Sequence, residues 1–457
     1  MAAGSHCLTV LALALSACAG ATPEPPAAPV KPTSPSFEVR PLDALIDEPV
    51  FLQVEGLRAG EQVTLRARME RGKSGVWSSS ATFTADPDGV VDLARQAPDA
   101  GSYEGVDAMG LMWSMTPEAE DWERGLFEEP PLAALTVVVS VERDGVELAT
   151  RTLIRRRVAE AVVRRDLRAD GLYGTLFLPP EATGAPAVLV LGGSEGGLRE
   201  GTAALLASRG FAALALAYFA ADGLPPTLQN IPLEYFESAL MWMKAQPEID
   251  GARIAVQGIS RGGELALLLG ATFPDIRAVV AHVPSGVVWQ GIGMAQAPAW
   301  TRGGEPVPFL SWPLDPALQA QWMQKLQAGE PISMAPMFQA AMDQPEAMAA
   351  AAIAVERIQG PVLLVSGKAD ALWPSTALAE LAAERLRAHG RPYEHLAFDD
   401  AGHLIVPPYL PTTISALTHP ALSMKIAFGG TPAGNARACA EAWRRMLSFL
   451  GESLRPQ

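Results

Sequence analysis

The sequence predicts an α/β protein in which a mostly parallel, doubly wound sheet follows a small antiparallel β-sandwich. From about Arg164 onward, short apolar runs alternate with helical stretches, which is typical of a mostly parallel sheet. Before residue 158, short alternating runs are separated by turn residues such as the Asp-Pro-Asp-Gly at 86–89, which favours antiparallel strands. A chain of 457 residues exceeds what one core usually fills. We therefore expect a sandwich domain at 37–158 and a parallel-sheet domain at 159–457.

A serine lies between a short apolar strand and a helix-forming stretch. The run Gln-Gly-Ile-Ser-Arg-Gly-Gly places Ser260 in a Gly-x-Ser-x-Gly pattern with Gly258 and Gly262. A sharp strand-to-helix turn crowds the backbone, so glycine is favoured on either side, and it presents the serine hydroxyl above the sheet edge. The first helical N–H groups point at the same space, where they can hold a developing oxyanion. The pattern predicts that Ser260 is a nucleophile.

An acid and a histidine follow in the order serine, acid, histidine, which hydrolases with this turn use. The apolar run 361–367 predicts a buried strand with Asp370 just past its carboxyl end, and 393–398 predicts a second strand, followed by His403. Functional groups gather at the carboxyl ends of such strands. His403 is expected to be the general base for Ser260, and Asp370 to hold its tautomer and stabilise the imidazolium.

Other residues compete for both roles: His282, His389, His395 and His419 for the base, and Asp399 and Asp400 for the acid. His282 follows an apolar run and is expected at a strand end. His389 and His395 flank a helix end and a strand, which is typical of ordinary surface or sheet positions. The two aspartates stay open as the acid, because some hydrolases of this kind carry the acid after a different strand.

A glycine-rich loop follows the apolar strand predicted at 187–191. Four of the six residues from Gly192 to Gly197 are glycine, which lets backbone N–H groups approach a ligand closely. We expect an oxyanion hole made by the backbone N–H of Arg261 and by one from this loop, that of Ser194 or Glu195. A phosphate-binding loop is the competing interpretation, but no Lys-Ser/Thr follows the glycines and their spacing differs from a dinucleotide fingerprint.

The C-terminal part resembles the α/β-hydrolase domain shared by acyl-CoA thioesterases of the mammalian type I kind and bile acid-CoA:amino acid N-acyltransferases. The resemblance rests on the Gly-Ile-Ser-Arg-Gly-Gly-Glu-Leu run at 258–265 and on the runs at 218–226, 231–236, 402–409 and 428–430. Upstream, the run at 101–115 resembles the signature of that family's N-terminal β domain. The resemblance covers nearly the whole mature chain in the same domain order. It implies an α/β-hydrolase fold and places Ser260, Asp370 and His403 at the positions of the family's catalytic triad.

The type of nucleophile bears on the reaction that the resemblance implies. The amidating transferases carry cysteine at this position, whereas this chain carries Ser260 and so resembles the thioesterase branch. We expect a serine hydrolase that cleaves an acyl thioester or ester through a Ser260 acyl-enzyme, with transfer to water and without a cofactor. Two alternatives stay open. The acyl group could pass to an amine or alcohol acceptor, or the chain could be a non-catalytic envelope protein that binds lipid.

Between about 285 and 350 the alternation of strands and helices lapses, and large soft side chains gather among prolines and glycines. They are Trp289, Trp300, Trp312, Trp322, Met294, Met323, Met334, Met337, Met342 and Met348. An insertion in this place often caps the nucleophile, and such side chains suit an apolar acyl pocket. Alternatively, they form the insertion's own core. Two roles also stay open for the β-sandwich domain: it recognises the substrate, or it only packs against the hydrolase domain.

The N-terminus predicts export and lipidation. The apolar stretch 8–15 is too short to span a bilayer and is typical of a signal peptide, here 1–17. The Leu-Ser-Ala-Cys that ends it resembles a bacterial lipobox, in which Cys18 is lipidated. Residues 18–36 then form a Pro/Ala-rich tether. Since Ala19 follows the cysteine, the expected place is the cell envelope, lipid-anchored in the outer membrane and facing the periplasm.

Charge and cysteine content narrow the range of partners. A formal net charge of −15 argues against nucleic acid, because neutralising phosphates requires basic patches. Of the three cysteines, only Cys439 remains after signal removal and lipidation, so no intramolecular disulfide is expected. The histidines and cysteines show no metal-ligand spacing.

Export separates the chain from cytosolic acyl-CoA. The expected partners are therefore an acyl ester or thioester substrate and the membrane.

Overall fold

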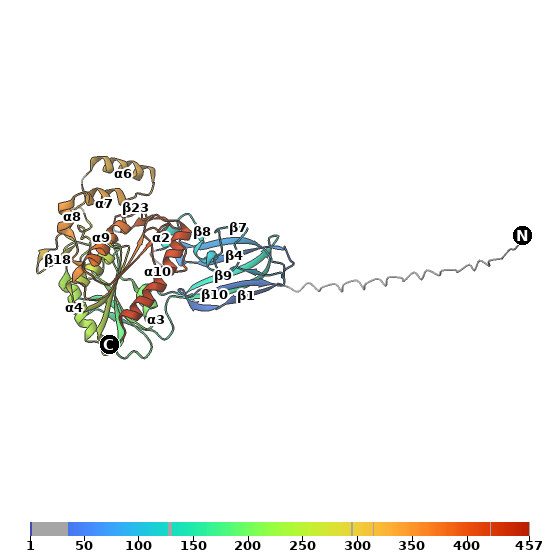
Figure 1. Ribbon diagram of the computed structural model, residues 1–457, viewed down its shortest axis with the longest axis horizontal. Helices are drawn as coiled ribbons and strands as arrows, with labels where there is room; N and C mark the ends of the chain where they lie inside the picture. Colours follow the sequence, from blue (N-terminus) through green and yellow to red (C-terminus); the bar gives the residue numbers. More distant parts are fainter. Residues whose placement is uncertain (2–34, 127–129, 294–295, 314, 421, 457) are drawn as a thin grey trace. The chain divides into compact units, whose positions relative to one another are not determined.

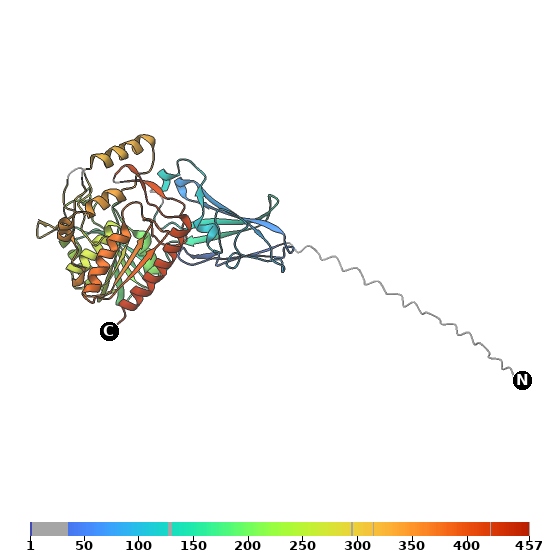
Figure 2. The ribbon, with the colours of Figure 1, turned by 45° about the horizontal axis from the view of Figure 1, so that its top comes forward.

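The computed structural model describes Met1 and residues 35–126, 130–293, 296–313, 315–420 and 422–456. Residues 2–17 of the predicted signal peptide and residues 18–34 of the tether, Cys18 among them, lie outside the described residues. Residues Pro35–Gln457 form one compact unit that contains an antiparallel β region and a mostly parallel sheet flanked by helices (Figures 1 and 2). Among the described helices, none combines the length and apolar character that crossing a membrane requires.

The larger part is built on an eight-stranded sheet. Across the sheet the order is β11 (Val163–Leu167), β12 (Tyr173–Leu178), β14 (Ala212–Ala217), β13 (Ala185–Leu191), β16 (Ile249–Ile259), β17 (Ile276–His282), β20 (Val362–Gly367) and β21 (Tyr393–Phe398). The pairings of β12 with β11 and with β14 are antiparallel, and every pairing from β14 to β21 is parallel. The predicted α/β-hydrolase type of sheet is confirmed.

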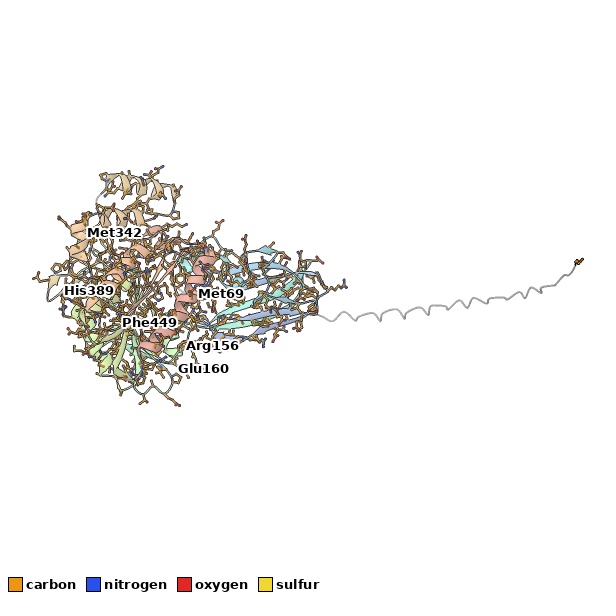
Figure 3. All side chains as sticks on the ribbon, viewed as in Figure 1. Met69, Arg156, Glu160, Met342, His389 and Phe449 are labelled. Atoms are coloured by element: carbon orange, nitrogen blue, oxygen red, sulfur yellow. The ribbon has the colours of Figure 1, made fainter. Side chains whose placement is uncertain are left out.

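Helices cover both faces of this sheet. One buried cluster includes residues of α4 (Leu233–Lys244), α5 (Arg261–Thr272) and α9 (Ser375–Ala388), and the other includes residues of α3 (Glu200–Ser208) and α10 (Pro432–Ser453), with Phe449 of α10 labelled in Figure 3. In β13, Val188 and Val190 belong to the α3/α10 cluster. Leu189 and Leu191 belong to the other cluster. Side chains alternate along a strand, so a strand covered on both faces is apolar throughout.

Two further sheets form the N-terminal part. The larger has the order β2 (Asp43–Leu45), β10 (Val146–Arg156), β9 (Leu135–Arg143), β4 (Gln62–Glu70), β5 (Val76–Thr84) and β7 (Ala100–Gly101), with β8 (Thr116–Pro117) beside β5; the smaller is β1 (Ser36–Arg40), β3 (Phe51–Glu55) and β6 (Val91–Asp92). Side chains of both sheets share one buried cluster, in which Phe37 and Leu52 meet Leu65 and Phe83. The predicted antiparallel pairing needs one correction, because β2 runs parallel to β10.

Three short helices accompany these sheets: η1 (Gly72–Ser74), α1 (Gly110–Trp113) and α2 (Trp122–Leu126). The chain that follows His403 packs onto this region. The backbone N–H of Thr412 donates to the Trp113 carbonyl at 2.9 Å, and the Thr413 hydroxyl donates to the Met115 carbonyl at 2.6 Å. Tyr409, Leu410 and Ile414 pack against the buried cluster of the N-terminal sheets. The histidine loop is therefore held from both parts of the unit.

The segment predicted as a cap contains β18 (Trp300–Arg302), β19 (Glu305–Pro306), α6 (Pro316–Ala328), α7 (Ala335–Met342) and α8 (Pro345–Ala351). β18 also pairs with β15 (Ile231–Pro232), and η2 (Val355–Arg357) leads back to the sheet. A hairpin of β22 (Ala416–His419) and β23 (Met424–Ala427) lies beyond the histidine loop. α7 buries Met337, Phe338 and Ala341, whereas Met323 and Leu326 of α6 are exposed.

Candidate active site

Ser260 lies at the turn from β16 into α5. Its backbone has φ 59° and ψ −122°, a conformation that residues other than glycine rarely adopt. The backbone N–H groups of Gly263 and Glu264 donate to the Ser260 carbonyl at 2.8 and 3.0 Å, which begins the helix. A Cβ on Gly258 would overlap the carbonyl oxygen of Gly262. Glycine at this position therefore permits the tight turn that presents Ser260.

His403 connects Ser260 to Asp370. The His403 Nε2 atom lies 2.9 Å from the Ser260 Oγ, and its Nδ1 lies 2.8 Å from Asp370 Oδ2. All three side chains are buried. The other oxygen of Asp370 accepts hydrogen bonds from the backbone N–H groups of Leu372 and Trp373, at 2.9 and 3.2 Å. With Nδ1–H donating to Asp370, Nε2 is left to accept the serine proton.

The run at 428–430 holds the acid and histidine loops together. Asp370 forms a β-bridge with Gly429, and the backbone N–H of His403 donates to the Phe428 carbonyl at 2.8 Å. The His403 ring stacks on Phe428 at 6.0 Å between ring centroids and meets the edge of Trp373 at 5.9 Å. These contacts fix the position of the imidazole between nucleophile and acid.

Three of the competing histidines make other contacts. His282 ends β17, its Nδ1 faces the Ile405 carbonyl at 3.4 Å, and burial lowers its pKa to about 4. His395 bonds with Ser366 at 2.8 Å, and the Nδ1 of His389 with the Arg385 carbonyl at 2.9 Å. The competing acids are also engaged elsewhere, because exposed Asp399 pairs with Lys368 and exposed Asp400 with Arg437.

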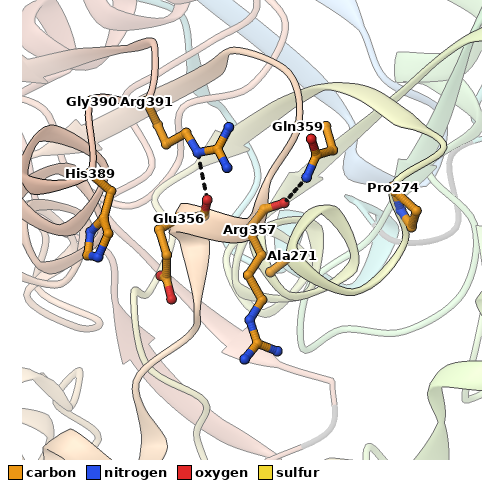
Figure 4. A pocket seen from close by; sticks show the side chains of 8 residues that line it. All are labelled: Ala271, Pro274, Glu356, Arg357, Gln359, His389, Gly390 and Arg391. Atoms are coloured by element: carbon orange, nitrogen blue, oxygen red, sulfur yellow. Dashed lines mark hydrogen bonds between the residues drawn. The ribbon is translucent and has the colours of Figure 1, made fainter.

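His389 lines a different cavity, of about 660 Å³, formed by the ends of α5 and α9 and by η2 (Figure 4). There the Arg391 Nε donates to the Glu356 carbonyl at 2.7 Å, and the Gln359 amide donates to the Arg357 carbonyl at 2.9 Å. None of its lining residues lines a cavity that contains Ser260. The chemistry predicted for Ser260 therefore lies elsewhere.

The glycine-rich loop after β13 runs beside the nucleophile. A Cβ on Gly193 would come within 3.2 Å of the Ser260 Cβ, and Ser194 lines both cavities that contain Ser260. The other predicted oxyanion donor, Arg261, is the first residue of α5. The two sides of the predicted oxyanion hole thus flank Ser260.

His419 is a site residue whose sequence context indicates no role beyond that of a possible base. Its Nε2 lies 2.8 Å from the Ser194 Oγ, although 225 positions separate the two residues. Burial lowers the pKa of His419, the Glu195 carboxylate opposes this shift, and His403 adds to it. No sequence spacing indicates such a pair, because the contact depends on the hairpin that carries His419.

In the part of the chain that the structure describes, Ser260 lines the two cavities considered next. One, of about 160 Å³, is also lined by His403 and by residues of the chain after it, including Leu404, Val406, Leu417 and Phe428. The other, of about 30 Å³, is also lined by Arg261 and by Ile292, Trp312, Met334, Phe338, Trp373 and Leu422. Of the tryptophans considered for the pocket, Trp300 instead packs on Tyr218 and Phe236 in the sheet core. Met294 lies outside the described residues.

Across the described residues, no group of three or more His, Cys, Asp or Glu side chains could hold a metal ion. Cys439 is a buried free thiol whose pKa burial raises to about 11. Its Sγ contacts the chain after His403, at 3.4 Å from the backbone nitrogen of Val406. The thiol therefore belongs to the packing behind the histidine loop.

The chain is similar in sequence to proteins of one known family. Residues 231–456 match the family model for the BAAT / acyl-CoA thioester hydrolase C terminal, and residues 47–169 match that for the acyl-CoA thioester hydrolase/BAAT N-terminal region. Acyl-coenzyme A thioesterase 6 of Mus musculus is 33% identical over 419 residues, covering 89% of this chain and 94% of that protein. Mitochondrial acyl-coenzyme A thioesterase 2 of Rattus norvegicus is 34% identical over 412 residues, covering 89% and 87%.

Among solved structures, a putative dienelactone hydrolase from Klebsiella pneumoniae subsp. pneumoniae MGH 78578 is 16% identical with a TM-score of 0.40, covering 64% of this chain and 98% of that chain. The assignment rests on the sequence matches, which run through both parts of the chain and extend over nearly the full length of the relatives. The chain belongs to the acyl-CoA thioester hydrolase/BAAT family and is a hydrolase.

Proposed function

We propose that this hydrolase cleaves an acyl thioester or ester through a covalent acyl-enzyme on Ser260. The observation that supports the proposal is the pair of hydrogen bonds that joins Ser260 to His403, at 2.9 Å, and His403 to Asp370, at 2.8 Å. The names of the relatives, acyl-coenzyme A thioesterases, favour an acyl-CoA-like thioester as the substrate.

In the first half-reaction the Ser260 Oγ attacks the carbonyl carbon while His403 Nε2 takes the hydroxyl proton. Asp370 stabilises the resulting imidazolium. The carbonyl oxygen becomes an oxyanion, which the backbone N–H groups of Arg261 and Ser194 stabilise. When the bond to the leaving sulfur or oxygen breaks, His403 passes the proton to that atom, and the acyl group remains on Ser260 as an oxyester.

In the second half-reaction water takes the place of the leaving group. His403 removes a proton from the water as it attacks the acyl carbon, and the same oxyanion donors stabilise the second tetrahedral intermediate. Its collapse returns the proton to Ser260 and releases the carboxylic acid. An amine or alcohol in place of water would give the transferase alternative, so the acceptor decides between the two reactions.

Active-site labelling tests the proposal. We expect a fluorophosphonate to label the full chain, with the adduct located on Ser260 by mass spectrometry, and we expect Ser260→Ala and His403→Ala to abolish labelling. His389→Ala is the matched control, because His389 lines the separate cavity of Figure 4, and it should label normally. No label on a folded wild-type chain would overturn the proposal and favour a non-catalytic lipid-binding protein.

Product analysis identifies the acceptor. Turnover of an acyl thioester in the presence of excess glycine, taurine or ethanol should still give the free carboxylic acid. An acyl amide or a new ester as the main product would show that the chain is a transferase.

The place of action is a separate part of the proposal. We propose that Cys18 is lipidated and fixes the protein in the outer membrane, facing the periplasm. Support comes from the sequence, namely the apolar stretch 8–15 and the lipobox-like Leu-Ser-Ala-Cys that follows. Metabolic labelling with a fatty acid should mark the wild type but not Cys18→Ala, and the variant should leave the membrane fraction. Equal fatty-acid labelling of the wild type and of Cys18→Ala would contradict the proposal.

A further inference from the structure

The two cavities at the nucleophile extend to different parts of the site. They share Ser194, Ser260, Leu372 and His419. Beyond these shared residues, the cavity of about 160 Å³ is bounded by His403 and the chain after it, and by Glu195, Arg199 and Ile259. The cavity of about 30 Å³ is bounded by Arg261, by the insertion and the acid loop, and by Leu422 of the β22–β23 hairpin. A substrate whose carbonyl carbon lies at Ser260 therefore has one cavity for each of its two ends.

The chemistry assigns the two ends. The leaving atom must lie where His403 can give it a proton, so the leaving group belongs in the larger cavity, which His403 lines. The carbonyl oxygen must lie next to the backbone N–H of Arg261, which lines the smaller cavity. Because the leaving group occupies the larger cavity, the acyl chain extends into the smaller one.

Phe338 lines the smaller cavity and contacts three tryptophan rings. Its ring meets the edges or faces of Trp289, Trp373 and Trp312 at centroid distances of 4.7, 5.5 and 5.9 Å. Trp289 and Trp373 are almost completely buried. Edge-to-face aromatic pairs of this kind stabilise the fold beyond the burial of their area. The ring of Phe338 is thus held in place from three sides.

The volumes differ enough to discriminate between substrates. An apolar cavity of about 150 Å³ accommodates benzene, whereas one water molecule occupies about 30 Å³ in the liquid. At about 30 Å³ the acyl-side cavity has room for a group the size of one water molecule or a methyl, while the leaving-group side, at about 160 Å³, has room for a group the size of benzene. A long acyl chain would have to displace Phe338 from its three aromatic neighbours.

We propose that the enzyme is selective for short acyl groups and that Phe338 sets this limit. The inference rests on the proposed acyl-enzyme function and names its substrate class: a thioester or ester that joins a short acyl group to a larger leaving group. Phe338 acts by filling space, and it takes no part in proton transfer.

The test varies the acyl chain and keeps the leaving group constant. Acetyl, butyryl, octanoyl and hexadecanoyl thioesters of N-acetylcysteamine are offered to the full chain, and thiol release gives kcat/KM. We expect kcat/KM to fall by about 10-fold or more from butyryl to octanoyl, since a single methylene in an apolar pocket already discriminates by about 10-fold. Phe338→Ala should raise the ratio of octanoyl to butyryl turnover by about 10-fold, and Phe338→Leu should shift it in the same direction with less loss of packing.

Phe309→Ala is the matched control. Phe309 is a partly buried phenylalanine of the same insertion that lines neither cavity, so its truncation should leave the chain-length profile unchanged. A wild-type enzyme that hydrolyses hexadecanoyl as fast as butyryl would overturn this inference while the proposed function stands. An equal profile in the wild type and the folded Phe338→Leu variant would overturn the role of Phe338. Failure to hydrolyse any chain length, together with absence of fluorophosphonate label, would overturn the proposed function and this inference with it.

Discussion

Arg261 and Glu264 form a buried ion pair in the first turn of the nucleophile helix, with Arg261 Nε 3.0 Å from Glu264 Oε2 and side chains that are 4% and 0% exposed. The Arg261 guanidinium also donates to the carbonyls of Trp289 and Gln290 at 3.0 and 2.8 Å, and the Glu264 carboxylate accepts from the Trp300 indole at 2.9 Å. Burial raises the pKa of Glu264, and the Arg261 charge opposes that rise. The pair therefore joins the residue after the nucleophile to the start of the insertion.

Removing one charge of this pair should destabilise the protein strongly. Glu264→Gln leaves the Arg261 guanidinium buried without its counter-charge, and breaking a buried pair in this way costs about 3–5 kcal/mol. Urea unfolding measures the loss. Asp399→Asn, which breaks an exposed ion pair with Lys368, is the control and should leave the unfolding midpoint unchanged. Equal midpoints for all three proteins would show that the Arg261–Glu264 pair contributes no net stability.

The identity of the acid can be decided by kinetics. Asp370→Asn keeps the shape of the side chain but favours the wrong tautomer of His403, and we expect kcat to fall by about 10⁴-fold. Asp399→Asn and Asp400→Asn alter exposed carboxylates that pair with Lys368 and Arg437 and should leave kcat unchanged. Stopped assays with a butyryl thioester measure all three. A large loss in Asp400→Asn with normal turnover in Asp370→Asn would reverse the assignment.

Acid should destabilise the fold through His282. Its pKa is lowered to about 4 from an ordinary 6.5 because the buried ring is costly to charge, so below pH 6.5 the unfolded chain binds the proton more readily than the folded one. The stability that neutral His282 contributes is complete above pH 6.5 and is lost as the pH falls towards 4, in total about 3 kcal/mol.

His282→Gln should reduce this dependence without removing it, because burial also lowers the pKa of His395 and His419. Urea unfolding at several values between pH 6.5 and 4 gives the slope for each protein. His389→Gln, which changes an exposed histidine, serves as the control. The same slope in the wild type and in His282→Gln would contradict the account.

Ser194 and His419 should act as a pair. Ser194→Ala keeps the backbone N–H predicted to stabilise the oxyanion and loses only the bond to His419, so the loss in kcat should be smaller than the about 10²–10³-fold cost of removing an oxyanion donor. His419→Ala should lower kcat similarly, and the double variant should fall little further, because both changes remove one interaction. Kinetics of the three variants measure the coupling. Losses that multiply in the double variant would show that the two side chains act independently.

Most of the hydrolase part is predictable from the sequence because Ser260 and Asp370 follow the apolar, buried ends of β16 and β20, and buried parallel strands are recognisable by their apolar character. β21, which precedes His403, is a partly buried strand that also contains Glu394 and His395. The order of serine, acid and histidine could therefore be predicted without knowing any contact. The assignment of catalytic roles to the three residues stays a prediction until labelling and kinetics test it.

Composition predicts the place of a side chain less well where the same residue type is found both in the core and at a cavity or surface. Trp300 and Trp312 belong to the same tryptophan-rich segment, yet Trp300 lies in the sheet core and Trp312 lines the cavity at Ser260. The arginines of a basic run such as 155–157 are usually solvated or ion-paired, yet Arg155 is buried and donates to the Ile46 and Glu48 carbonyls. Only the packing of distant segments distinguishes these cases, and a short window of sequence does not contain it.

The attachment of Thr412 and Thr413 to the carbonyls of Trp113 and Met115 limits how the molecule can be divided. The general base proposed at position 403 is supported through a stretch of chain whose partners belong to the N-terminal sheets. A fragment cut to contain only the eight-stranded sheet would keep the serine turn but leave this stretch without its partners. Experiments that fuse the hydrolase to another protein, or evolve it in the laboratory, should therefore keep the whole of Pro35–Gln457.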